Sequence, residues 1–366
     1  MASQGHTWPN IPHSANTVSV AIIDTTSVIT APARAFVTPV LEGDETWKVP
    51  AYSFLIQNFQ TNRSVLFDLG VRKDWENLAP TLYHRLKQSG FDVETEKGVR
   101  EILDENGVDT SASNIEAIIW SHCHFDHTGD PATFDSGTAL VVGPGVKEHL
   151  MPGYPTNPDS SLLDSDWAGR QVREISFEKS ALQIGRFKAF DYFSDGSFYL
   201  LNAPGHALGH MGALARVTSN PVSFVFLGAD SAHHGGELRP SEHMPFPHAI
   251  PHLGLHGETI CPGALFEELG GSGDPTKPFY RPTDTGSNLD VVATADTIGK
   301  IQEFDALENV LVVLAHDPSI AEHVKLFPTT AVNFFSLNWK AKTQWAFLRN
   351  FETILQLQKQ RNLTDG

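Results

Sequence analysis

The chain has 366 residues, of which 40% are hydrophobic, and a formal net charge of −17. A chain of this length can bury a large core in one domain or in two. The negative charge argues against nucleic acid or an anionic membrane as a partner, because both attract basic surfaces. With two cysteines and no apolar stretch of membrane-spanning length, we expect a cytoplasmic protein without a disulfide framework.

The first hundred residues read as strands that give way to helices. Apolar residues 17–23 predict a first strand, and residues 51–57 and 64–68 predict two strands of a hairpin. Leucines four apart predict a helix over residues 75–89, and residues 97–106 predict another that ends before a glycine. The sheet is therefore expected to begin with a hairpin, and helices follow it.

A cluster of candidate metal ligands follows the apolar run 115–120. The pattern H-x-H-x-D-H places His122, His124, Asp126 and His127 within six residues at the end of a predicted strand. Residues i and i+2 of a strand share a face, so the two histidines of H-x-H are expected to bind one ion together. The turn after them directs Asp126 and His127 towards a second ion. Imidazole and carboxylate ligands without thiolate favour zinc, with iron, cobalt, nickel and manganese as alternatives.

Three later apolar runs also end at a residue of ligand type. His206 follows a strand predicted over residues 198–201, Asp230 follows the run 224–229, and His316 follows the run 310–315. A helix is predicted over residues 290–304, a short helix over residues 146–150 and a packing helix over residues 339–358. Candidate ligands therefore recur at the ends of several strands.

In this order, the motif at residues 122–127 and the three later residues resemble the metallo-β-lactamase superfamily. An early strand that ends in Asp68-Leu69-Gly70 fits the same family. The resemblance spans roughly residues 18–320 and implies the α+β class, with a four-layer αββα sandwich. We expect one domain over residues 1–366.

The resemblance also implies a ligand set and a mechanism. His122, His124 and His206 would hold one zinc ion, and Asp230 would bridge it to a second, held by Asp126, His127 and His316. The ions would share a hydroxide that attacks a substrate carbonyl. Behind the ligands, Asp68 is expected to orient an imidazole and Cys123 to face away from the metal as a small buried hydrophobe, while His210 is expected to support the site or pack in the core.

A long insertion precedes the last ligand. Residues 231–288 are rich in proline, glycine and histidine and weak in periodicity, and loops of this length are usually functional lids or disordered segments. We expect a lid over the active site; the alternative is a surface excursion. Its six histidines match no known metal pattern, so a polar lid accounts for them: His233, His234, His243, His248, His252 and His256.

His233 carries a specific expectation. Acyl homoserine lactonases of this superfamily have a tyrosine three residues after the bridging aspartate, and this chain has His233 there. A histidine could donate the same hydrogen bond or protonate a leaving group. Asp126 and His233 are therefore the residues expected to take part in catalysis.

The substrate expectation also comes from resemblance. The chain is similar to fungal members of the lactonase-like branch that open benzoxazolinones, which favours a small lactam, cyclic carbamate or lactone as substrate. Acyl homoserine lactones and thioesters are alternatives, and an iron-dependent sulfur oxygenase is disfavoured by the complete ligand set. Members of this branch often form dimers, so a homodimer is expected from the resemblance alone. Four aromatic residues of the insertion would suit a flat ring, unless they only pack the insertion: Phe246, Phe266, Phe279 and Tyr280.

Overall fold

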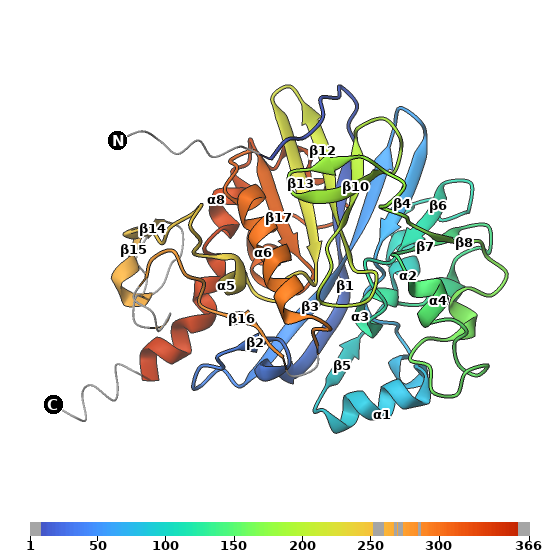
Figure 1. Ribbon diagram of the computed structural model, residues 1–366, viewed down its shortest axis with the longest axis horizontal. Coiled ribbons are helices and arrows are strands. Elements are labelled where there is room, and N and C mark those ends of the chain that lie inside the picture. The colour runs from blue at the N-terminus through green and yellow to red at the C-terminus, as the bar shows by residue number, and fades with distance from the viewer. Residues whose placement is uncertain (1–8, 252–259, 267–268, 270–273, 285–286, 358–366) are drawn as a thin grey trace.

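Two large sheets dominate the computed structural model, which describes residues 9–251, 260–266, 269, 274–284 and 287–357 (Figure 1). Within these residues, the strand order of the first sheet is β5 (Asp92–Thr95), β1 (Ser19–Pro32), β3 (Thr46–Asn58), β4 (Arg63–Phe67), β6 (Ile115–Ile119), β7 (Ala139–Val142) and β8 (Val172–Glu174). That of the second is β17 (Val310–Leu314), β13 (Val222–Ala229), β12 (Met211–Ser219), β11 (Phe198–Asn202), β10 (Phe187–Asp191) and β9 (Gln183–Ile184).

Parallel pairing brings several strand ends to one edge. In the first sheet β4 pairs with β6 in parallel, and in the second β13 pairs with β17 in parallel. Strand β11 runs in the direction of β13, because β12 lies antiparallel to both. The residues that follow β4, β6, β11, β13 and β17 can therefore meet at the carboxyl ends of the strands, where α/β sheets commonly bind ligands.

The interior between the sheets is apolar. Val20, Ile56 and Phe67 from the first sheet and Leu200 and Leu227 from the second belong to one core cluster, and each is fully buried. Alternate residues of a strand point to opposite faces, so the outer face of each sheet needs its own cover. Two further buried clusters provide it, with α2 against the first sheet and α6 against the second (Figure 1). This confirms the predicted αββα sandwich.

The helices and small sheets complete the fold. Among the described residues, the labelled α-helices are α1 (Pro80–Gln88), α2 (Val99–Glu105), α3 (Phe125–Thr128), α4 (Val146–His149), α5 (Gly235–Leu238), α6 (Val291–Asp305), α7 (Ser319–His323) and α8 (Trp339–Thr343), and residues 352–357 are also helical. The 3-10 helices are Ala33–Ala35, Trp75–Asn77, Pro131–Thr133, Asp164–Asp166, Gly263–Phe266, Ala331–Asn333 and Ala346–Phe351. Two small sheets pair β14 (Ala249–Pro251) with β15 (Ile260–Pro262) and β16 (Arg281–Pro282) with β2 (Val37–Thr38). No helix among the described residues is long and apolar enough to cross a membrane.

Three predicted elements differ from those observed. The first strand continues to Pro32, because a register shift between Asp24 and Val28 carries it past a polar stretch. The helix predicted over residues 75–89 begins only at Pro80, where proline suits the first helical turn. The single helix predicted over residues 339–358 was wrong, since α8 gives way to a 3-10 helix. Its buried side chains do not follow one helical stripe, since Ala346, Phe347, Leu348 and Phe351 are all buried.

Candidate metal centre

The seven candidate ligands lie on loops and helix starts that follow strand ends. His122 and His124 lie in the loop after β6, and Asp126 and His127 lie in α3. The expectation that a strand projects the two histidines of H-x-H onto one face was therefore wrong, because β6 ends at Ile119. Their imidazoles still come together, with ring centroids 4.5 Å apart. His206, Asp230 and His316 follow β11, β13 and β17 of the second sheet.

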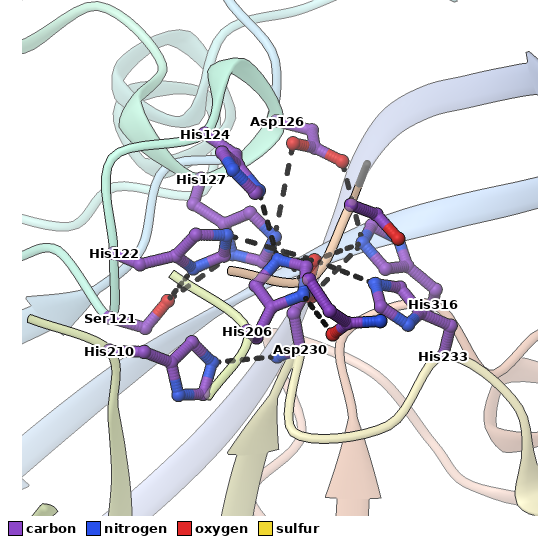
Figure 2. Close-up of polar contacts among 12 residues, drawn as sticks. Ser121, His122, His124, Asp126, His127, His206, His210, Asp230, His233 and His316 are labelled. Carbon is purple, nitrogen blue, oxygen red and sulfur yellow. Dashed lines mark hydrogen bonds and ion pairs between the residues drawn. The ribbon is translucent and has the colours of Figure 1, made fainter. Parts of the chain in front are cut away.

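All seven side chains converge on one small volume (Figure 2). They form two groups, each with its candidate ligand atoms within 4.8 Å of one another, and Asp230 belongs to both. The first group is His122, His124, His206 and Asp230, and the second is Asp126, His127, His316 and Asp230. The grouping agrees with the division of ligands that the resemblance implies.

The spacing of these atoms suits a divalent cation. Zinc binds imidazole nitrogen at roughly 2.0–2.1 Å in tetrahedral geometry, so two ligand atoms of one ion lie about 3.3 Å apart. Oδ1 of Asp230 lies 3.0 Å from Nε2 of His127 and 3.1 Å from Nε2 of His316. Its other oxygen, Oδ2, lies 3.4 Å from Nε2 of His206. The carboxylate of Asp230 thus divides its oxygens between the two groups.

Several of these atoms are buried without a hydrogen bond. Among the described residues, Nε2 of His122, Nε2 of His127 and Oδ1 of Asp230 are shielded from solvent and have no hydrogen-bond partner. Burying unsatisfied polar atoms is costly, and native structures rarely do so without a reason. A bound cation would satisfy all three atoms, so the residues present fit a divalent metal.

In three of the imidazoles, Nδ1 makes a hydrogen bond outside the site, and this bond directs Nε2 into the site. Nδ1–H of His127 donates to Oδ2 of Asp68 at 2.8 Å, and Nδ1–H of His316 donates to the Pro50 carbonyl at 2.6 Å. Nδ1–H of His206 donates to Oδ1 of Asn288 at 3.2 Å. A neutral imidazole with its proton on Nδ1 keeps the Nε2 lone pair free for a metal. Asp68 thus takes the orienting position expected for it.

The electrostatics of the two groups differ. Burial lowers the pKa of His122 and His206 well below the usual value, and that of His124 to about 4, so these imidazoles are neutral at pH 7. Burial also disfavours charge on His127 and His316, but the carboxylate of Asp230 outweighs it and raises the pKa of both. In the second group, a divalent cation would take the place of the protons that the carboxylate attracts.

Two supporting residues lie behind the ligands. Nδ1–H of His210 donates to the Ala203 carbonyl at 2.8 Å, and its Nε2 accepts the backbone N–H of Asp230 at 3.2 Å (Figure 2). His210 therefore supports the site and is not a member of either ligand group, as expected. Asn288 was missed by the sequence analysis, because a lone asparagine in an aperiodic stretch gives no signal. Cys123 is buried in the apolar cluster outside the first sheet, as expected for a small hydrophobe.

His233 adjoins the site but belongs to neither group. Its Nε2 lies 3.4 Å from Oδ2 of Asp230, and its ring is parallel to that of His316 at 5.9 Å between centroids. The backbone N–H of His233 donates to Oε2 of Glu237 at 2.6 Å, which fixes the start of α5. On the other side, the ring of Phe36 lies 5.2 Å from that of His233.

The other histidines of the insertion have different surroundings. Nδ1 of His234 accepts the backbone N–H of Gly236 at 2.9 Å, so its side chain caps α5. His243 and His248 belong to neither ligand group. His252 and His256 lie outside the described residues.

The aromatic residues of the insertion mostly pack against the C-terminal segment. Phe266, Phe279 and Tyr280 are buried, and Phe246 is partly buried, in a cluster with Trp345, Phe347 and Phe351. The ring of Phe279 lies 5.1 Å from that of Phe351, and Phe246 lies 5.3 Å from Trp345. The expectation that these rings face a flat substrate was wrong, because the C-terminal segment supplies their apolar partners.

Comparisons with known proteins agree with the fold and the ligand pattern. The sequence model of the metallo-beta-lactamase superfamily matches residues 46–252. Gamma-lactamase FDB1 of Fusarium pseudograminearum (strain CS3096) is 46% identical over 360 residues, which cover 96% of this chain and 87% of that protein. Gamma-lactamase MBL2 of Gibberella moniliformis (strain M3125 / FGSC 7600) is 48% identical over 65% of this chain and 100% of its own length.

A solved structure shows the same fold at low sequence identity. It is a quorum-quenching N-acyl homoserine lactone hydrolase, with a TM-score of 0.55, 15% identity and coverage of 87% of this chain and 99% of its own. The match to the family, the identity to its fungal members and the two groups of candidate ligands lead to one conclusion. The chain belongs to the metallo-beta-lactamase superfamily.

Proposed function

We propose that this metal-dependent hydrolase opens the ring of a small cyclic amide, cyclic carbamate or lactone, and that a benzoxazolinone-type ring is the preferred substrate. The observation that carries the hydrolytic chemistry is the convergence of five imidazoles and two carboxylates, three of whose buried atoms lack a hydrogen bond: Nε2 of His122, Nε2 of His127 and Oδ1 of Asp230. Two of the fungal relatives are named gamma-lactamases, which supports a cyclic amide.

Two zinc ions would be held by the two ligand groups, to both of which Asp230 belongs. When bound, two divalent ions lower the pKa of a shared water towards neutrality and polarise a substrate carbonyl. Side chains of the protein position these ligands and the attacking water. His210 and the start of α5 hold Asp230 and His233 in place, and Asp126 presents a carboxylate that accepts a hydrogen bond from the attacking water.

His233 is proposed to act on the other side of the reacting bond. Its Nε2 lies close to Asp230, and the ring of Phe36 limits its movement. From this position, Nε2–H can donate a hydrogen bond to the carbonyl oxygen or deliver a proton to the leaving atom. No serine or cysteine nucleophile is required.

Three phenylalanine rings support a flat substrate. Phe36 contacts both His233 and His316, and its ring lies 6.1 Å from that of Phe91. Phe91 is partly exposed and meets Phe125 edge to face at 6.2 Å. Phe36 and Phe125 are themselves buried, so the partly exposed ring of Phe91 is the one proposed to pack against an aromatic ring fused to the scissile ring. The insertion over residues 231–288 is proposed to close the pocket around it.

One experiment tests the proposal. Zinc-loaded protein is incubated separately with 2-benzoxazolinone and a long-chain acyl homoserine lactone, with metal-free protein as the control. Mass spectrometry follows ring opening, as the gain of one water for the lactone and as 2-aminophenol for benzoxazolinone, whose carbamic acid product loses CO2. We expect benzoxazolinone to open only with the metal-loaded protein. Turnover of the lactone alone would replace the proposal with a lactonase in which His233 stands for the usual tyrosine. If neither compound were turned over, the ring-opening proposal would be overturned and thioesters would be the next substrates to test.

A further inference from the structure

The end of the insertion makes direct contact with a candidate ligand. The backbone N–H of Leu289 donates to the His206 carbonyl at 2.9 Å, and that of Asp290 donates to the Gly205 carbonyl at 2.8 Å. The side chain of Asn288 reaches the imidazole of His206 itself, with Oδ1 at 3.2 Å from Nδ1. Residues 288–290 are therefore hydrogen-bonded to the loop that carries His206, through both their backbone and the side chain of Asn288.

The hydrogen bonds of Asn288 fix which nitrogen of His206 carries the proton. Nδ2–H of Asn288 donates to the Thr283 carbonyl at 2.9 Å, so its amide nitrogen must face Thr283 and its oxygen must face His206. An amide oxygen only accepts, so His206 must carry its proton on Nδ1. Nε2 of His206 then carries the lone pair and accepts a hydrogen bond from Nδ1–H of His124 at 2.9 Å.

The stretch that holds Asn288 is itself anchored. Strand β16 pairs with β2 through Arg281 and Pro282, and Oγ of Ser287 donates to the Ala35 carbonyl. Gly205 lies so close to α6 that a Cβ atom there would approach the Thr294 nitrogen to 2.2 Å. Asn288 thus lies between α6 and the pair that β16 forms with β2, a strand near the start of the chain.

The source of the outer partner distinguishes His206 from two other ligands. The partners of His127 and His316 are Asp68 and Pro50, and both come from the first sheet. The partner of His206 comes from the insertion. Because such outer hydrogen bonds fix ring orientation and basicity, their loss typically weakens metal binding by about 10–100-fold.

We propose that Asn288 is a positioning residue that sets the metal affinity of the His122–His124–His206 group. The insertion is then a structural part of one metal site, in addition to any role in closing the pocket. The inference concerns metal binding and does not depend on which ring the enzyme opens.

The test is a metal titration of protein stripped with a chelator, in competition with a chromogenic zinc indicator. We expect Asn288→Ala to weaken one of two binding steps by about 10–100-fold and to leave the other unchanged. His206→Ala identifies the affected step, because it should abolish that step. Asn309→Ala is a matched control, since its Nδ2–H also donates to a backbone carbonyl, that of Val222 at 3.0 Å, at an exposed site.

Asn288→Asp separates positioning from loop structure. It keeps an acceptor for Nδ1–H of His206, loses the donor to Thr283 and adds a negative charge that raises the basicity of the imidazole, so affinity should be no weaker than that of the wild type if the His206 bond is what matters. Equal weakening in Asn288→Asp and Asn288→Ala, equal weakening of both steps, or an unchanged titration of Asn288→Ala would each overturn the proposal. If Asn288→Ala fails to fold, the zinc titration of Asn288→Asp is the test. Weakened binding in the step identified by His206→Ala would then contradict the proposal. Since no substrate is used, these outcomes are independent of the ring-opening assay.

Discussion

At the scale of single residues, the site is defined by the hydrogen bonds of atoms that do not face the metal. The carboxylate of Asp68 accepts from two donors, Nδ1–H of His127 at 2.8 Å and the backbone N–H of Ser121 at 2.6 Å. The backbone N–H can only donate, so Oδ1 of Asp68 remains bonded to Ser121 and Oδ2 remains bonded to His127. Burial raises the pKa of Asp68, and the bond to His127 opposes that shift.

This arrangement predicts a large effect of Asp68→Asn. The backbone N–H of Ser121 would hold the amide oxygen, so the amide nitrogen would face Nδ1 of His127 and move the imidazole proton to Nε2. We expect metal affinity of the Asp126–His127–His316 group to fall by about 10–100-fold. Zinc titration measures it, with the exposed Asp296→Asn as control. Native affinity in Asp68→Asn would show that the tautomer of His127 is not controlled in this way.

The proposed role of His233 is tested by His233→Phe. Phenylalanine keeps a flat ring against Phe36 and His316 but removes the Nε2–H. We expect ring opening to slow by about 10²-fold or more, the usual range for loss of a general acid, while zinc content stays unchanged. Steady-state kinetics with metal analysis measure both. Undiminished turnover with metal bound would show that His233 takes no part in catalysis.

Asp166, at the end of a 3-10 helix, predicts a pH effect on stability. Burial raises the pKa of its carboxyl to about 7 from an ordinary 3.8, so the folded protein favours the protonated form. Its contribution to stability is therefore complete below pH 3.8 and is lost as pH rises through about 7. Asp166→Asn keeps an acceptor for the Leu163 N–H, which Asp166 accepts at 3.1 Å. We expect Asp166→Asn to be more stable than wild type at pH 8 by on the order of 1–3 kcal/mol, and equal to it near pH 3.5, in denaturant unfolding. A pH-independent difference would contradict the assignment.

At the scale of elements, strand ends were predictable and irregular segments were not. The strand over residues 310–314 and the helices near residues 97–106 and 290–304 were predicted to within two residues, because their apolar periodicity decides them locally. The ligands were found because each ends an apolar run. Strands β2 and β16 have two residues each and lie more than 240 residues apart in sequence, so no local pattern could show that they pair. Asn288 was missed because a lone asparagine in an aperiodic stretch gives no local signal, and its contact with His206 joins residues 82 apart in sequence.

The contact between the His206 loop and α6 makes a prediction about Gly205. Its φ of +126° and the 2.2 Å approach to Thr294 leave no room for a side chain. We expect Gly205→Ala to displace His206, to lower stability by about 2 kcal/mol or more and to weaken zinc binding. Gly299→Ala, within α6, is the control and should be neutral or slightly stabilising, because its backbone is helical and its nearest neighbour is 3.7 Å away. Equal stability of the two variants, measured by thermal unfolding, would contradict this view of the loop.

At the scale of the whole molecule, the candidate centre joins the two sheets. Four of its ligands follow β6 of the first sheet, and His206, Asp230 and His316 follow strands of the second. Each group contains ligands from both sheets, so an ion held by either group would connect both halves of the sandwich at one edge. The unfolded chain has no such site, so metal binding adds to the free energy of unfolding.

Metal removal should therefore lower the stability of the entire fold rather than that of a local loop. A ligand at a hundredfold excess over its Kd adds about 2.7 kcal/mol, so we expect chelation to lower the Tm of one cooperative transition by several degrees and added zinc to restore it. Asp230→Ala is the control. It removes the carboxylate shared by both groups, so it should bind less metal, turn over less substrate and respond little to chelator. If chelation removed the metal, as verified by metal analysis, and left the Tm of the wild type unchanged, the centre would not connect the sheets energetically.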